Sequence, residues 1–147
     1  MRPTVLIADG HRLYADALSA MLSPTYEIVG IGTNGRELTE LAVRFEPDLI
    51  VTGISMPVLN GLEALRVLKT MGLHSKVIVL TMHVDVSLAV DAFRSGASAF
   101  VLKTASLEEF TNALQVVQGG GCYLSLQLPS DLVSVLAEAA SHPAVGG

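Results

Sequence analysis

The stretch from Pro47 to Lys69, PDLIVTGISMPVLNGLEALRVLK, decides the fold. Its first part, DLIVTG, carries a continuous apolar run, which predicts a strand that is buried on both faces. The Met-Pro and Asn-Gly pairs that follow predict a turn. The last part predicts an amphipathic helix, because three leucines recur on one face: Leu62, Leu65 and Leu68. A buried strand, a turn and a helix together form the repeating unit of a parallel α/β sheet.

The same pattern recurs five times along the chain. Apolar strand candidates lie at Thr4–Ala8, Glu27–Ile31, 48–53, Lys76–Thr81 and Ser98–Leu102, and each is followed by a helical period. Such alternation predicts βαβ units with right-handed crossovers. We therefore expect an α/β fold of the flavodoxin-like (βα)5 class, a three-layer sandwich with a five-stranded parallel sheet. The strand order 2-1-3-4-5 fits this class, although periodicity alone does not fix it.

Polar and glycine residues predict where several helices begin and end. Asn34 is expected to cap the second helix, and Ser106 the fifth, with Glu109 completing a capping box. Gly96 is expected to end the fourth helix. In the first helix, about 11–22, the predicted apolar face comprises Leu13, Ala17, Leu18, Met21 and Leu22.

The pattern breaks at the three glycines 119–121. We expect one domain over residues 1–122. Residues 123–147 are predicted to be a linker with one further helix at about 129–140.

Composition limits the kinds of partner that this chain can bind. The formal net charge is −5, and the nine lysines and arginines are scattered, which argues against DNA contact by these residues. No apolar stretch approaches the roughly 20 residues of a membrane span. A single cysteine allows no internal disulfide and fits a reducing compartment. These features predict a soluble, cytoplasmic protein without a membrane segment.

One edge of the predicted sheet gathers the residues that could carry chemistry. The loops at the carboxyl ends of parallel strands meet at one edge, where ligands bind in open sheets. Asp9 and Gly10 follow the first strand, Gly53 ends the third, Thr81 ends the fourth and Lys103 follows the fifth. An acid, a hydroxyl and a lysine are thus expected to converge there.

Five segments of the chain resemble the receiver domain of two-component response regulators, in particular the NarL/FixJ subfamily. They are VLIADGH, PDLIVTGISMPVLNGLEALRVLK, VIVLTMH, GASAFVLKTAS and GGGCYLS, and they match in order and spacing over about residues 4–125. In that family an aspartate at the end of the third strand accepts a phosphoryl group. Mg²⁺ is held by this aspartate and by an acidic pair after the first strand. A hydroxyl and a lysine bind the phosphoryl oxygens.

The resemblance assigns a role to each residue of the predicted edge. Asp9 matches the first acid of the pair, and Thr81 and Lys103 match the hydroxyl and the lysine. Gly10 stands where the second acid would be, and Gly53 stands where the acceptor would be. The resemblance therefore implies a degenerate phosphorylation pocket with no catalytic residue, no acceptor at position 53, no metal ligand set and weak or absent Mg²⁺ binding.

Two further expectations concern the remaining residues of the pocket. Lys103 is expected to pair with Asp9, directly or through water, because a partly buried lysine needs compensation. Phe100 lies where receivers place their switching aromatic residue. Without a phosphoryl signal, we expect its ring to be locked in one rotamer.

The resemblance implies a pseudo-receiver that is not an enzyme. It would belong to a transcription factor and act by phosphorylation-independent homodimerisation or by binding a partner protein. The family commonly uses the face of helices four and five with strand five for this purpose. NarL/FixJ proteins usually continue into a LuxR-type helix-turn-helix domain, so DNA contact would come through a C-terminal domain that this chain does not contain. Two alternatives stay open: an active receiver with a surrogate acceptor, and a small-ligand sensor that uses the vacated pocket.

Overall fold

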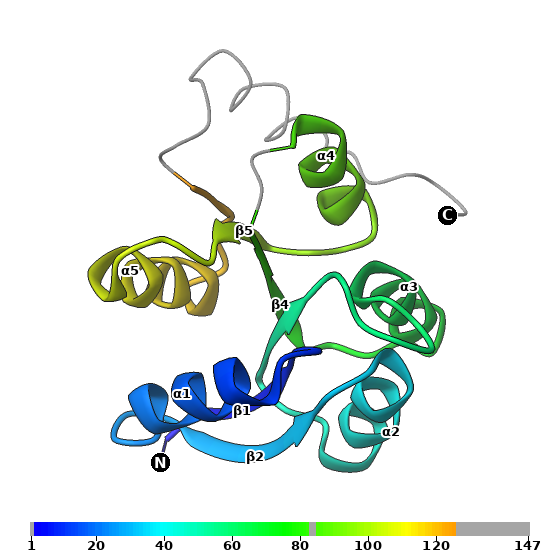
Figure 1. Ribbon diagram of the computed structural model, residues 1–147, viewed down its shortest axis with the longest axis horizontal. Helices are drawn as coiled ribbons and strands as arrows, with labels where there is room; N and C mark the ends of the chain where they lie inside the picture. Colours follow the sequence, from blue (N-terminus) through cyan, green and yellow to red (C-terminus); the bar gives the residue numbers. More distant parts are fainter. Residues whose placement is uncertain (1, 83–84, 126–147) are drawn as a thin grey trace.

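Strands and helices alternate along the whole described chain (Figure 1). The computed structural model describes residues 2–82 and 85–125. In chain order the elements are β1 (Thr4–Ala8), α1 (Arg12–Leu22), β2 (Glu27–Gly32), α2 (Gly35–Phe45), β3 (Leu49–Gly53), α3 (Gly61–Thr70), β4 (Lys76–Thr81), α4 (Val86–Arg94), β5 (Ala99–Leu102), α5 (Leu107–Gln118) and β6 (Tyr123–Leu124). This is the flavodoxin-like α/β arrangement that the sequence predicts.

The sheet is parallel and has the order β2-β1-β3-β4-β5-β6. The five predicted strands and their order are confirmed, and a short sixth strand that the sequence did not predict extends the sheet. The short strand β6 pairs with β5, and the Tyr123 amide donates to the Ser98 carbonyl (3.0 Å). The predicted linker from residue 123 therefore begins with two residues that join the sheet. The helix expected at about 129–140 lies outside the described residues.

The sheet separates two hydrophobic clusters, since successive side chains of a strand point to opposite faces. In β1, Val5 and Ile7 pack with α1 and α5, whereas Leu6 and Ala8 pack with α2, α3 and α4. Figure 1 shows α1 and α5 on one side of the sheet and the other three helices on the opposite side. The three-layer sandwich is thus confirmed. Among the described residues, no helix combines the length and apolar character that crossing a membrane requires.

The predicted helix ends are largely confirmed. The Asn34 side chain accepts from the Glu37 amide (2.9 Å) at the start of α2. Gly96 has a φ of 108° after α4, and its amide donates to the Phe93 carbonyl (3.0 Å). This left-handed conformation favours glycine and closes the helix.

The start of α5 is held in two ways. Ser106 accepts from the Glu109 amide (3.0 Å), which confirms the predicted cap, while the return bond of the capping box from Glu109 stays a prediction. The Glu109 carboxylate also accepts from the Tyr123 hydroxyl (2.9 Å), which ties α5 to β6.

The predicted apolar face of α1 is partly wrong. Leu18 and Leu22 are buried, but Leu13 is 86% exposed and Met21 is 46% exposed. The buried face instead contains Ala15. Leu13 lies on the outer side of the helix, whereas Met21 is half-exposed and lines a small cavity between α1 and α5 with Leu18 and Phe110.

Candidate functional site

The carboxyl edge of the sheet brings together the residues that end β1, β3, β4 and β5. Neighbouring strands end level with one another, because Gly53 pairs with Leu80 and Thr81 pairs with Leu102. Asp9 directly follows β1, and Lys103 directly follows β5. The Lys103 amide also donates to the Thr81 carbonyl (2.7 Å). The structure therefore places the predicted residues at one edge, each on its own loop or strand end.

An ion pair joins the two charged residues of this edge. Lys103 Nζ lies 2.6 Å from Asp9 Oδ2, across 94 positions of the chain. The Asp9 side chain is 2% exposed and that of Lys103 is 12% exposed. The other carboxylate oxygen, Oδ1, accepts from the His11 amide (2.8 Å). The expected pairing of Lys103 with Asp9 is confirmed as a direct, largely buried contact.

Gly53 leaves room for the Asp9 carboxylate. A Cβ atom at position 53 would lie 2.7 Å from Asp9 Oδ2, 3.3 Å from Asp9 Cγ and 3.7 Å from Lys103 Nζ. A Cβ atom essentially never lies within 3.0 Å of another heavy atom, so a side chain at residue 53 would require the Asp9 carboxylate to shift. The ion pair therefore lies where a side chain at residue 53 would begin.

Gly61 is a second glycine that the site requires, and the sequence analysis did not single it out. A Cβ atom there would collide with the carbonyl group of Gly53. The Gly61 amide donates to the Ile54 carbonyl (2.9 Å) as α3 begins. Glycine at this position lets the first turn of α3 approach the end of β3. The Asn-Gly pair predicted the turn, but only the folded backbone shows this approach.

Gly10 lies at the exposed rim of the site. A Cβ atom at position 10 would come within 3.0 Å of the Ser55 carbonyl oxygen, so the loop after β3 would have to give way slightly. The two loops border a shallow depression that is lined by Gly10, His11, Ser55, Met56, Pro57 and Asn60. Gly10 and Gly53 thus face different neighbours, and only Gly53 faces the ion pair.

Tyr14 covers the ion pair and was missed by the sequence analysis. Lys103 Nζ lies 4.5 Å from the centroid of the Tyr14 ring, a cation–π distance. Burial, with the negative charge of Asp9 as a second cause, raises the pKa of Tyr14 to about 12. The phenol therefore stays neutral at physiological pH. Its position one helical turn before the buried Leu18 is the signal that could have placed it on the inner face of α1.

Phe100 is fully buried on the opposite face of β5. It belongs to the cluster that includes Ala89, Ala92 and Phe93 of α4. The ring therefore points inward, toward α4. That it is locked in a single rotamer stays a prediction.

The donor set of this edge does not fit Mg²⁺. This ion prefers octahedral oxygen ligation with one or two carboxylates. Within the described residues, no three His, Cys, Asp or Glu side chains gather where they could hold a metal ion. Both oxygens of Asp9 are already bonded, one to the Lys103 ammonium and one to the His11 amide. A cation that took this carboxylate would leave Lys103 buried without its partner.

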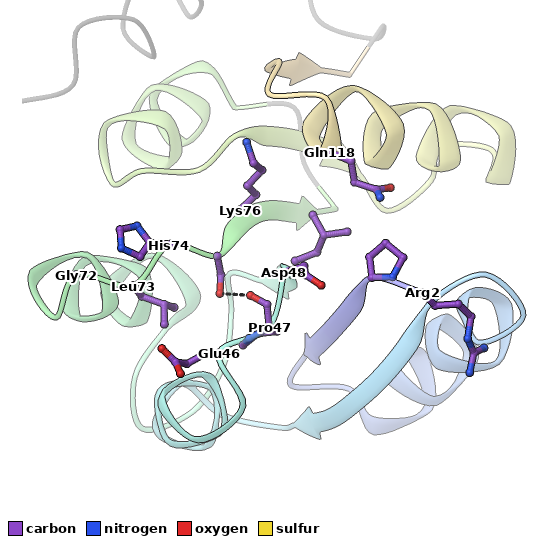
Figure 2. Close-up of a pocket in the computed structure, with 12 residues that line it drawn as sticks. Arg2, Glu46, Pro47, Asp48, Gly72, Leu73, His74, Lys76 and Gln118 are labelled. Atoms are coloured by element: carbon purple, nitrogen blue, oxygen red, sulfur yellow. Dashed lines mark hydrogen bonds between the residues drawn. The ribbon is translucent and has the colours of Figure 1, made fainter.

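A larger cavity, of about 710 Å³, lies at the opposite edge of the sheet (Figure 2). Its charged lining residues include Arg2, Asp48 and Lys76. Figure 2 shows the Arg2 and Lys76 side chains pointing away from each other. The Arg2 guanidinium donates to the Ser23 carbonyl (2.5 Å), and Asp48 accepts from the Thr4 amide (2.8 Å). Asp48 thus ties the starts of β1 and β3 together and Arg2 holds the end of α1, so these groups do not converge on a common point.

The fold and the residues of the carboxyl edge agree with comparisons to known proteins. The family model for the response regulator receiver domain matches residues 5–115. The chain belongs to the response regulator receiver family. Its sequence is 33% identical to the transcriptional regulatory protein DegU of Brevibacillus brevis, over 88% of this chain and 56% of that protein. It is 31% identical to the nitrate/nitrite response regulator protein NarL of Escherichia coli K12, over 90% of this chain and 62% of NarL.

Solved structures of LuxR-family response regulators have the same fold as this receiver. One from Aurantimonas superimposes with a TM-score of 0.81 at 22% identity, over 97% of this chain and 100% of that chain. A DNA-binding response regulator from Staphylococcus aureus superimposes with a TM-score of 0.75 at 25% identity, over 79% and 98%. This receiver is thus of the NarL/LuxR type. The chain spans less than two thirds of the length of DegU and NarL.

Proposed function

We propose that this receiver is a pseudo-receiver that signals without phosphorylation of residue 53. The observation that carries the proposal is the position of the Asp9 carboxylate. It lies 2.7 Å from where a Cβ atom of residue 53 would be, and it is paired with Lys103. In this proposal Asp9, Gly10, Gly53, Thr81 and Lys103 form a degenerate phosphorylation pocket.

The chemistry of phosphoryl transfer supports this proposal. An acyl phosphate forms on a carboxylate nucleophile, and glycine carries none. Transfer also needs cations that neutralise the charge of the phosphoryl group. Here the ammonium of Lys103 is already neutralised by Asp9, and the donor set does not fit Mg²⁺.

A surrogate acceptor is the alternative to this proposal, and the nearby hydroxyls argue against it. Thr52 is 1% exposed, and its hydroxyl donates to the Gly53 carbonyl (2.8 Å). Ser55 is exposed but carries a neutral hydroxyl, which lacks the acceptor's carboxylate chemistry. The small-ligand alternative needs an unpaired cation in the pocket, and the Asp9–Lys103 contact weighs against it.

We further propose that the receiver regulates transcription through protein contacts and catalyses no reaction. DegU is a transcriptional regulatory protein, and the Staphylococcus aureus relative is a DNA-binding response regulator. By analogy, DNA contact would come through a separate C-terminal domain, in the cytoplasm. The receiver would form a homodimer or bind a partner protein through the face of α4, β5 and α5. The single locked rotamer of Phe100, which is buried under α4, would hold this face in one state.

Intact-mass measurement after incubation with acetyl phosphate and Mg²⁺ tests the proposal. We expect no added phosphoryl group on the wild-type protein. The matched control is Gly10→Asp/Gly53→Asp, which restores both carboxylates, together with a related receiver that has them naturally. A phosphoryl group on the wild-type protein would overturn the proposal, and Ser55→Ala would then show whether Ser55 carries it.

A further inference from the structure

We propose that Asp9 is an internal ligand of Lys103. Its carboxylate fills an oxyanion site formed by the Lys103 ammonium and the His11 amide beside the end of β3, and so keeps external oxyanions out. This inference rests on the proposed function, in which residue 53 carries no phosphoryl group. It adds that the pocket is not vacant, because the chain occupies it with a carboxylate of its own.

The Asp9 carboxylate fills the space beside Gly53. Asp9 precedes the first turn of α1, and its side chain reaches across to the end of β3. An ideal Cβ atom at Gly53 would lie 2.7 Å from Oδ2 and 3.3 Å from Cγ of Asp9. The carboxylate therefore occupies volume that any side chain at residue 53 would enter. Protein interiors are close-packed, so a second oxyanion can enter this volume only if the Asp9 carboxylate moves aside.

An ion pair and a hydrogen bond hold the two oxygens of the Asp9 carboxylate in place. Oδ2 lies 2.6 Å from Lys103 Nζ, and Oδ1 accepts from the His11 amide (2.8 Å). The Tyr14 ring lies over the ammonium at 4.5 Å. A small anion from solution would have to displace a carboxylate that is held on the same chain. Such a tethered group competes at an effective concentration of about millimolar or more.

The group that Asp9 supplies to Lys103 indicates which class of external ligand could replace it. Asp9→Ala would remove a carboxylate and leave a space of its size beside an unpaired, largely buried ammonium. A buried ammonium needs a compensating anion. The space therefore suits a small oxyanion, and acetate reproduces the missing group most closely.

The test compares acetate with chloride at matched ionic strength in three proteins. They are the wild type, Asp9→Ala and Asp9→Ala/Lys103→Met, and thermal unfolding is measured for each. Ligand binding to the folded state raises the melting temperature by mass action. We expect a saturable rise of roughly 2–4 °C for Asp9→Ala. The wild type and the double variant should show no such rise, which removes general salt effects as the cause.

A rise in the wild type as large as that in Asp9→Ala would overturn the inference, because the site would then be open in the native protein. An equal response of Asp9→Ala and the double variant would overturn it as well, since Lys103 would not be the binding group. If Asp9→Ala does not fold, amide NMR of the wild type decides. We expect no saturable shift at Gly53 and Lys103 on acetate titration, and such a shift would contradict the inference. None of these outcomes involves phosphoryl transfer, so they are distinct from failure of the proposed function.

Discussion

The two edges of the sheet each hold an aspartate that joins distant segments, but they do so in different surroundings. At the carboxyl edge Asp9 is 2% exposed and pairs with Lys103 over 94 positions. At the amino edge the exposed Asp48 accepts from the amide and the hydroxyl of Thr4 over 44 positions. A buried charge depends on its partner, whereas an exposed one is solvated by water. The two tethers should therefore contribute very different amounts to the free energy of unfolding.

Removing the partner of the buried aspartate should have the largest effect. Lys103→Met leaves the Asp9 carboxylate buried without a counter-charge, and breaking such a pair typically destabilises by about 3–5 kcal/mol. We expect the lower end, about 3 kcal/mol, because the His11 amide still donates to Asp9. Urea unfolding measures this change. The control is Asp9→Asn/Lys103→Met, which should regain part of the loss. A single variant as stable as the wild type would show that the pair has no energetic role.

The exposed tether at the other edge should matter less. Asp48→Ala removes two hydrogen bonds from Thr4, and we expect a loss of about 1 kcal/mol because water can replace them. The same unfolding assay applies, with Thr4→Ser as a variant that keeps the hydroxyl. A loss equal to that of Lys103→Met would mean that burial does not separate the two edges.

The smallest effect is expected for the hydroxyl of Tyr14. Its pKa is raised to about 12, so the neutral phenol is favoured by the folded state relative to the unfolded chain, where the value is near 10. This contribution is complete below about pH 10 and is lost as the pH rises toward 12. Tyr14→Phe should therefore not change how the free energy of unfolding varies with pH around neutrality. Ultraviolet titration of phenolate should show one group fewer near pH 12 in the variant, with Tyr123, whose pKa is also raised to about 12, remaining. If the variant instead lacked a phenol that titrates near pH 10, the partly buried position of Tyr14 would be contradicted.

The sequence predicted the order of the first five strands but missed β6. The alternation of apolar runs and helical periods is long enough to indicate five units, and the flavodoxin-like class that they fit indicates their order. Tyr123–Leu124 is too short to show a period and follows three glycines. Its pairing depends on β5 offering a free edge, which is a property of the folded sheet.

The face of α1 shows a second limit. Two sets of apolar positions in α1 both recur at helical spacing: 13, 17 and 21, and the buried positions 15, 18 and 22. Spacing alone cannot tell which of two neighbouring apolar stripes faces the sheet, and Leu13 was assigned to the wrong one. The orientation of α1 that buries positions 15, 18 and 22 also places Tyr14 beside Lys103. The wrong prediction of the buried face therefore hid a residue of the site.

At the site itself, electrostatic reasoning predicted the contact of Lys103 with Asp9. It did not predict that the carboxylate takes the space beside Gly53, because that depends on side-chain direction. The approach of Gly61 to the Gly53 carbonyl was hidden for the same reason. Residue types and spacing thus predicted the members of the site, and the folded backbone determined how they share its volume.

The central claim is that Asp9 occupies the place of a side chain at residue 53, and a double-mutant cycle tests it most directly. Gly53→Ala is introduced into the wild type and into Asp9→Ala, and urea unfolding is measured for all four proteins. We predict that Gly53→Ala destabilises the wild type by about 2 kcal/mol, since overpacking costs about 1–3 kcal/mol. In the Asp9→Ala background it should be nearly neutral, which gives a coupling of at least about 1 kcal/mol. An equal loss in both backgrounds would contradict the claim.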